Sequence, residues 1–91
     1  MNRQINDEFL TKNLFEKDKI GCGYFPWRYE DKDASICISP WCEGGKCFIF
    51  GENRNTKESI HLERPTMYRL TRNDLKRVVD FLGIKLDFDY E

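Results

Sequence analysis

The sequence has little net charge, no long hydrophobic run and a single histidine, and each shortage excludes a class of function. Its 15 basic and 16 acidic side chains leave a formal net charge of -1 at pH 7 over 91 residues. This balance argues against a strongly basic nucleic-acid binder and against an acidic polyanion mimic. No apolar stretch approaches the roughly 20 residues of a membrane-spanning helix. The sequence therefore predicts no membrane partner.

The first residues lack the apolar centre of a signal peptide, since the chain starts with the sequence MNRQINDE. We therefore expect a cytoplasmic protein in a reducing compartment, where the 4 cysteines are free thiols or metal ligands rather than disulfides. Its 40% hydrophobic and 14% aromatic content is too high for a disordered chain. Length and composition together predict one domain over residues 1–91.

Motifs for catalysis and for phosphate binding are also missing. A Cys–His pair needs both side chains within hydrogen-bond reach and a third group to orient the base. Nothing in the sequence places a particular cysteine beside His61. The Gly-Cys-Gly segment at 21–23 lacks the longer glycine pattern and the following lysine of a phosphate loop. We therefore predict that the protein is not an enzyme.

Apolar periodicity predicts a helix near each end of the chain. Asn6 is a good N-cap residue for a helix over residues 6–17. The spacing of Thr71 and Asp74 is typical of a second helix start, and Gly83 is a good residue to end that helix. The apolar residues of the two helices are Phe9, Leu10, Leu14 and Phe15 in the first, and Leu75, Val78, Val79 and Leu82 in the second.

Strands are expected between the helices and after the second one. The predicted strands are residues 34–39, 47–52, 57–63, 66–70 and 84–90. The first two form a hairpin, because Gly44 and Gly45 supply the positive φ of a tight turn. The last strand alternates apolar and polar residues and suits a sheet edge. Residues 28–33 carry charges of both signs and are expected to be a loop.

This order of elements predicts an α+β fold, a small antiparallel sheet of four to five strands with an N-terminal helix and a C-terminal helix. Strands 34–39 and 47–52 are apolar on both faces. A sheet covered on one face would alternate more regularly. Either the helices cover both faces, or another chain covers one of them.

An aromatic cluster near the middle of the chain is the candidate partner-binding site. Large rings and arginine anchor protein interfaces because they bury much area and keep a polar end. The candidate contact residues are Tyr24, Trp27, Arg28, Tyr29 and Trp41. The alternative is that Phe25 and Trp27 form a small core beneath the loop, as most tryptophans are largely buried.

The four cysteines are candidate zinc ligands, although the sequence has no C-x-x-C pair. Cys42 and Cys47 flank the predicted hairpin turn, and Cys22 lies between two glycines. Cys37 is predicted in the middle of a strand, which is a poor position for a ligand. The alternative is that these residues are small buried apolar side chains and a loop thiol, with no cofactor bound.

We therefore expect a small protein-binding module that acts by steric occlusion of a larger protein or protein–nucleic-acid complex. In size and architecture it is similar to small inhibitors of the immunity-protein or phage anti-defence type, although no motif supports that likeness. The first alternative is a zinc-stabilised nucleic-acid-binding or regulatory module. The second is a homodimeric structural or adaptor protein, paired through the second sheet face or through the edge formed by residues 84–90.

Overall fold

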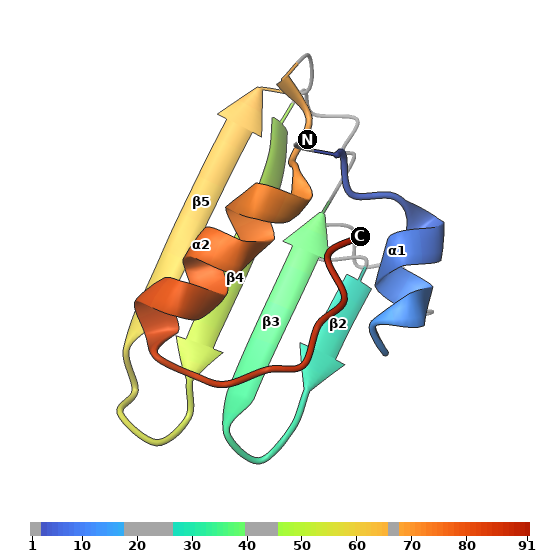
Figure 1. Cartoon of the computed structure of the whole chain (residues 1–91). Helices are drawn as coiled ribbons and strands as arrows, with labels where there is room; N and C mark the ends of the chain where they lie inside the picture. Colours follow the sequence, from blue (N-terminus) through green and yellow to red (C-terminus); the bar gives the residue numbers. More distant parts are fainter. Residues whose placement is uncertain (1–2, 18–26, 40–45, 66–67) are drawn as a thin grey trace.

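A five-stranded antiparallel sheet with both helices on one face makes up the described part of the protein (Figure 1). The computed structural model describes residues 3–17, 27–39, 46–65 and 68–91. In chain order the elements are α1 (Asp7–Lys12), β1 (Glu16–Lys17), β2 (Trp27–Glu30), β3 (Ala34–Ser39), β4 (Lys46–Asn53), β5 (Ser59–Pro65) and α2 (Arg72–Leu82). The strands lie side by side in sequence order. The predicted α+β class is confirmed.

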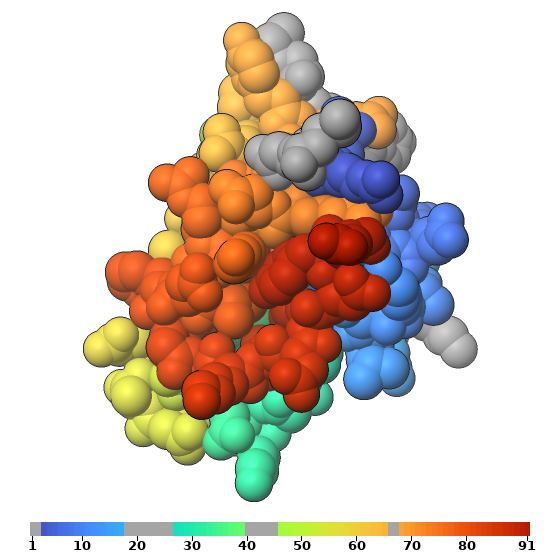
Figure 2. Space-filling view, in the orientation of Figure 1, coloured from blue at the N-terminus to red at the C-terminus, as the bar shows by residue number. Residues whose placement is uncertain are grey.

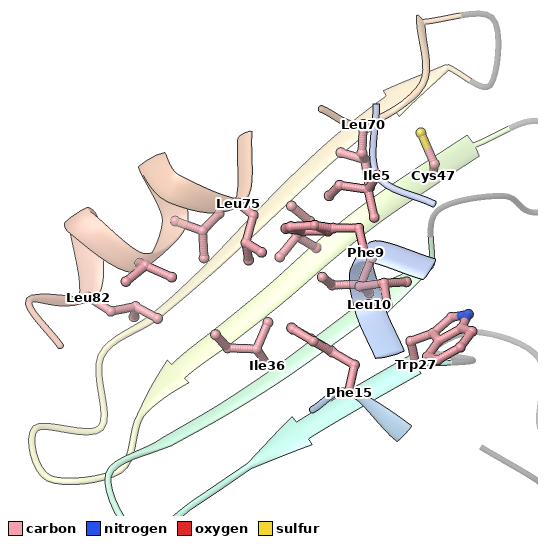
Figure 3. Close-up of a cluster of buried hydrophobic side chains, with 14 residues drawn as sticks. Ile5, Phe9, Leu10, Phe15, Trp27, Ile36, Cys47, Leu70, Leu75 and Leu82 are labelled. Carbon is pink, nitrogen blue, oxygen red and sulfur yellow. The ribbon is translucent and has the colours of Figure 1, made fainter. Parts of the chain in front are cut away.

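The core lies between the sheet and the two helices. Ile36 and Ile38 of β3 and Ile49 of β4 are fully buried on the inner face, which is the face toward the helices. Figure 3 shows side chains of both helices pointing onto this one face. Of the two alternatives for covering the sheet, the one in which the helices cover both faces is therefore wrong for the described residues. No helix within the described ranges is long and apolar enough to cross a membrane.

The opposite, outer face of the sheet also carries aromatic side chains. Phe48 and Phe50 of β4 point to this face, because they alternate with the buried Cys47 and Ile49. Phe50 is 37% exposed and Phe48 is nearly buried. Both rings meet the imidazole of His61 edge-on, with centroid distances of 6.3 and 5.5 Å. This row of rings explains why β4 reads as apolar on both sides.

Helix α1 starts as predicted and ends early. The Asn6 side chain accepts a hydrogen bond from the Phe9 backbone N–H at 2.8 Å, which confirms the N-cap. The helix ends at Lys12, and Leu14 adopts a positive φ of 69° and is 76% exposed. The prediction that Leu14 belongs to the apolar side of this helix is therefore wrong. Phe15 returns to the core.

Helix α2 agrees with its predicted capping and packing. Thr71 and Asp74 form a reciprocal capping box, and Gly83 ends the helix in the left-handed conformation with φ 69°. The four predicted apolar residues are buried against the sheet. They approach β4 where it has no side chain: a Cβ on Gly51 would lie 2.9 Å from Leu82 Cδ1 and 3.0 Å from Val78 Cγ1.

Three of the predicted strands are present. The predictions of a loop at the start of residues 28–33 and of a strand that includes residues 68–70 are wrong. Strand β3 has the predicted bounds, β4 is slightly longer at each end, and β5 lies two residues later than the predicted 57–63. Strand β2 occupies Trp27–Glu30, part of the segment expected to be a loop. Residues 68–70, which fall in the predicted strand 66–70, form no strand, and the Leu70 carbonyl instead accepts from the Ile5 N–H at 3.0 Å.

The C-terminal residues 84–90 are not the edge strand that their alternation predicts. They cross the inner face in an extended conformation and fill the space between α2 and α1 (Figures 1 and 2). Their alternating apolar residues, including Phe88 and Tyr90, do pack against the core. The Asn13 side-chain amide replaces a neighbouring strand: it donates to the Asp89 carbonyl at 3.1 Å and accepts from the Asp89 N–H at 2.7 Å.

Replacement of the buried Asn13 tests this arrangement. In Asn13→Ala both Asp89 backbone groups lose their partner, so we expect the free energy of unfolding to fall by about 1–3 kcal/mol. Amide exchange at Asp89 should become faster. Urea unfolding and hydrogen exchange measure the two effects, with the exposed neighbour Thr11→Ala as the control. Equal stability of the two variants would show that the segment is held by other contacts.

Candidate protein-interaction surface

The three predicted contact residues that the structure describes, Trp27, Arg28 and Tyr29, do not form one surface. Trp27 and Tyr29 pair with Ile38 and Ile36, so both point to the inner face. Trp27 is only 8% exposed and belongs to the core. Arg28 lies between them on β2 and is exposed on the outer face. The alternation of side chains along a strand separates these three residues, while Tyr24 and Trp41 lie outside the described residues.

Tyr29 is held in place by its neighbours rather than presented to a partner. Its hydroxyl donates to Asp31 Oδ2 at 2.8 Å, and its ring packs edge-on against Phe88. Burial raises the pKa of Tyr29 to about 12, and the hydrogen bond to Asp31 acts in the same direction. The hydroxyl therefore remains a protonated donor across the physiological pH range.

A cleft of about 350 Å³ lies beside Tyr29, between the end of α1 and the C-terminal segment. Its charged residues are of both signs, namely Lys12, Asp31, Lys85 and Asp87. Lys12 already pairs with Asp89 at 3.3 Å and donates to the Glu91 carbonyl. Asp31 accepts from the Asp33 and Ala34 backbone N–H groups. Lys12 and Asp31 are thus used within the chain, and the remaining charges, Lys85 and Asp87, are of opposite sign, so the cleft offers no set of like-charged groups for a ligand.

The core position of Trp27 leads to a direct test of its assigned role. Truncation of a large buried aromatic side chain costs about 3–5 kcal/mol, so we expect Trp27→Ala to lower the free energy of unfolding by that amount. Arg28→Ala, on the opposite face of the same strand, should change it by less than about 1 kcal/mol. Denaturant unfolding measures both. A stable Trp27→Ala variant with impaired partner binding would instead support the contact role.

The two described cysteines do not converge on one site. Cys37 is half-buried on the outer face, whereas Cys47 is buried on the inner face and its thiol contacts the Arg64 carbonyl at 3.6 Å. Burial raises the pKa of both thiols. One metal ion cannot bind both because the sheet separates them. No cluster of three metal-ligating side chains occurs among the described residues, and Cys22 and Cys42 lie outside them.

His61 is exposed on the outer face, away from any described thiol. Phe50 of β4 pairs with Cys37 on one side and with His61 on the other, so cysteine and histidine are two strands apart. Neighbouring strands are about 4.8 Å apart, which places Cys37 well beyond hydrogen-bond reach of the imidazole. Neither of the two described cysteines therefore forms a Cys–His pair with His61.

The feature that sequence reasoning missed is the margin formed by β5 and α2. Strand β5 is the last strand of the sheet, and its outer edge has no strand beside it within the described residues (Figure 1). Its inner-face residues Ile60 and Leu62 are half-buried and contact the core. An edge strand presents unpaired backbone N–H and C=O groups along its length. Helix α2 contacts both β4 and β5, so it borders this edge.

An ion pair fixes α2 along β5. The Arg64 guanidinium donates to both oxygens of Asp74, from Nη2 at 2.9 Å and from Nε at 3.2 Å. Burial alone would raise the pKa of Asp74, but the Thr71 backbone N–H and the Arg64 guanidinium outweigh it and hold the pKa below 3.8. The carboxylate thus caps the helix and ties it to the edge strand with one side chain.

The lowered pKa of Asp74 makes the contribution of its ion pair with Arg64 to stability sensitive to acid. A carboxyl whose pKa is lower in the folded state stabilises the fold above its unfolded pKa, and this stabilisation is lost as pH falls through the folded value. We expect the free energy of unfolding of the wild type to fall more steeply below about pH 4 than that of Asp74→Asn. Urea unfolding at several pH values measures this difference.

The comparison isolates Asp74 because the other carboxyls with lowered pKa values, Asp31 and Asp89, are present in both proteins. Parallel pH profiles of wild type and variant would contradict the assignment of the Arg64 contact to the folded state in solution.

Two side chains of α2 remain exposed on the side toward β5. Successive helical residues turn by about 100°, so Arg77 and Phe81 lie within roughly one sixth of a turn of Asp74, which faces β5. Phe81 is 57% exposed, although it lies next to the buried Leu82. Arg77 is exposed and makes no ion pair with the described residues. Together with the β5 edge, Ile60 and Leu62, these residues form what we call the β5–α2 margin.

No family model, curated protein or solved structure matches this chain. The sequence did contain one signal for the margin, since Phe81 is an aromatic residue outside the apolar spacing of its helix.

Proposed function

We propose that this protein is a small protein-binding module without catalytic activity. It binds a segment of a larger partner and thereby covers that segment. The observation that supports this proposal most is the β5–α2 margin, a free seven-residue edge strand beside a helix with an exposed aromatic side chain. Extended peptides bind such edges by strand addition, in which main-chain hydrogen bonds give affinity and side-chain contacts give specificity.

The margin has the parts that strand addition requires. The outer edge of β5 supplies backbone donors and acceptors up to Pro65, which has no N–H and limits the length of pairing. Phe81 supplies an apolar anchor above the plane of the added strand. The ion pair of Arg64 with Asp74 keeps the helix at a fixed distance from that strand. A partner segment held in this way is no longer accessible to other molecules, which is steric occlusion.

The two alternative functions have less support from the geometry. A zinc site built from all four cysteines is incompatible with Cys37 and Cys47 on opposite faces of the sheet. A homodimer through residues 84–90 is also disfavoured, because these residues cover the core between the helices. A homodimer through β5 would occupy the edge that we propose for the partner segment, and hydrogen exchange of the chain alone distinguishes these two occupants.

A comparison of three baits tests the proposal. The wild type, Phe81→Ser and the control Leu14→Asn are used to capture proteins from cells of the source organism. Leu14 is an apolar residue away from the margin that is even more exposed than Phe81, and Asn tolerates its positive φ. We expect the wild type and the control to capture the same partner in similar amounts. Phe81→Ser should bind that partner with an affinity lower by about tenfold or more.

Equal retention of every captured protein by the three baits would exclude the margin as the binding surface. Thermal unfolding of each bait verifies that the substitutions leave the fold intact, as expected for exposed side chains.

A further inference from the structure

The side chains along the β5–α2 margin specify what kind of segment fits it. We infer that the bound segment is an extended strand that carries an apolar residue and an acidic residue two positions apart, on the side facing α2. This inference rests on the proposed strand addition at β5 and adds the chemistry of the partner. It follows from the spacing of Phe81 and Arg77 along the helix and from the charges around them.

Helix α2 runs antiparallel to β5, and two contacts fix their alignment. Near the start of the helix, Asp74 binds Arg64 at 2.9 Å. Near its end, Leu82 packs over Gly51, and Gly51 pairs with Ile60 of β5. The eight residues from 74 to 82 span about 12 Å of helix, and the four residues from 64 to 60 span about 13 Å of strand. Residues 74–82 of the helix therefore lie alongside residues 64–60 of the strand over their whole length.

The spacing of the exposed helix side chains matches the repeat of a strand. Phe81 and Arg77 are four residues apart, which is about 6 Å along a helix axis. Residues i and i+2 of a strand, which share a face, are about 6.6 Å apart. A strand added to β5 therefore places one inner-face side chain beside Phe81 and Ile60, and the next beside Arg77 and Leu62.

The chemistry of these two positions differs. Beside Phe81 and Ile60 the surroundings are apolar, so an aliphatic or aromatic side chain fits there and extends the core. Arg77 has no ion pair within the described residues. The acid nearest to β5, Asp74, is already bound by Arg64. Asp80 is three residues after Arg77, but it lies further from β5 and forms no ion pair with Arg77 in the described part of the chain. A carboxylate on the added strand is therefore the complement of Arg77.

The β5 strand of a second copy lacks the required acid on the side facing α2. Residues directly opposite in an antiparallel pair point to the same face, so a copy of β5 would present Ile60, Leu62 and Arg64 toward the helix. None of these side chains is acidic, and a second Arg64 would add a positive charge near Arg77. The acidic residue of β5, Glu63, points to the outer face and pairs with Lys46 at 3.3 Å. Charge complementarity thus favours a different protein as the occupant.

Selection from a random decapeptide display library on the full-length chain tests the inference. We expect enriched peptides in which an apolar residue stands two positions from Asp or Glu. Arg77→Glu should select Lys or Arg in place of the acid and should bind the wild-type peptides about tenfold more weakly. Lys32→Glu, an equal charge reversal at an exposed turn position, should select the same peptides as the wild type.

Hydrogen exchange of the β5 amides, measured in the presence of the selected peptides, tests strand addition at β5 separately from the inferred motif. If peptides protect β5 but show no acidic preference and no response to Arg77→Glu, the inferred motif is wrong and strand addition stands. If no selected peptide protects β5, both fail. If β5 becomes protected on raising the concentration of the chain alone, a second copy occupies the edge, and both are again overturned.

Discussion

The close approach of α2 to β4 at Gly51 is the contact on which the arrangement of the molecule depends. A side chain at this position would overlap Leu82 and Val78, so only glycine allows the helix to lie this low over the sheet. The helix then reaches β5, where Arg64 binds Asp74 and fixes its direction. The short α1 and the extended C-terminal segment cover the rest of the inner face (Figure 2). Phe81 and Arg77 are left exposed above an open sheet edge as a consequence.

Most of the fold could be predicted from local patterns. Asn6, Thr71, Asp74 and Gly83 signal their helix ends through hydrogen bonds with near neighbours, and β3 is marked by a short run of strand-forming residues, ASICIS. Segments whose partners are distant in sequence were misjudged. Residues 84–90 alternate like a strand, but the side chain of Asn13, 76 residues before Asp89, takes the place of a strand partner. Strand β2 was not predicted because its charged residues, Arg28 and Glu30, are typical of a loop. In the structure both lie on the outer face of the sheet and form an ion pair with each other.

The candidate site was less accessible from the sequence. Aromatic residues near position 27 suggested an exposed cluster, but β2 turns Trp27 into the core and Arg28 to the opposite face. Sequence spacing gives no information on which strand ends the sheet, and the open edge of β5 follows from the order of all five strands. The pairing of Arg64 with Asp74 likewise needs the tertiary structure. Partner binding by aromatic anchors remains the proposal, now placed at Phe81 rather than at the predicted cluster.

Hydrogen exchange of the individual β5 amides in the free protein tests the central claim most directly. In an edge strand, alternate residues point their N–H groups toward the neighbouring strand and the others point outward to water. If the β5 edge is free, slow and fast exchange alternate along residues 59–64, and this pattern is unchanged over a range of protein concentrations. Uniform protection of these amides at every concentration would show that the edge is already covered, and would contradict the β5–α2 margin as a binding surface.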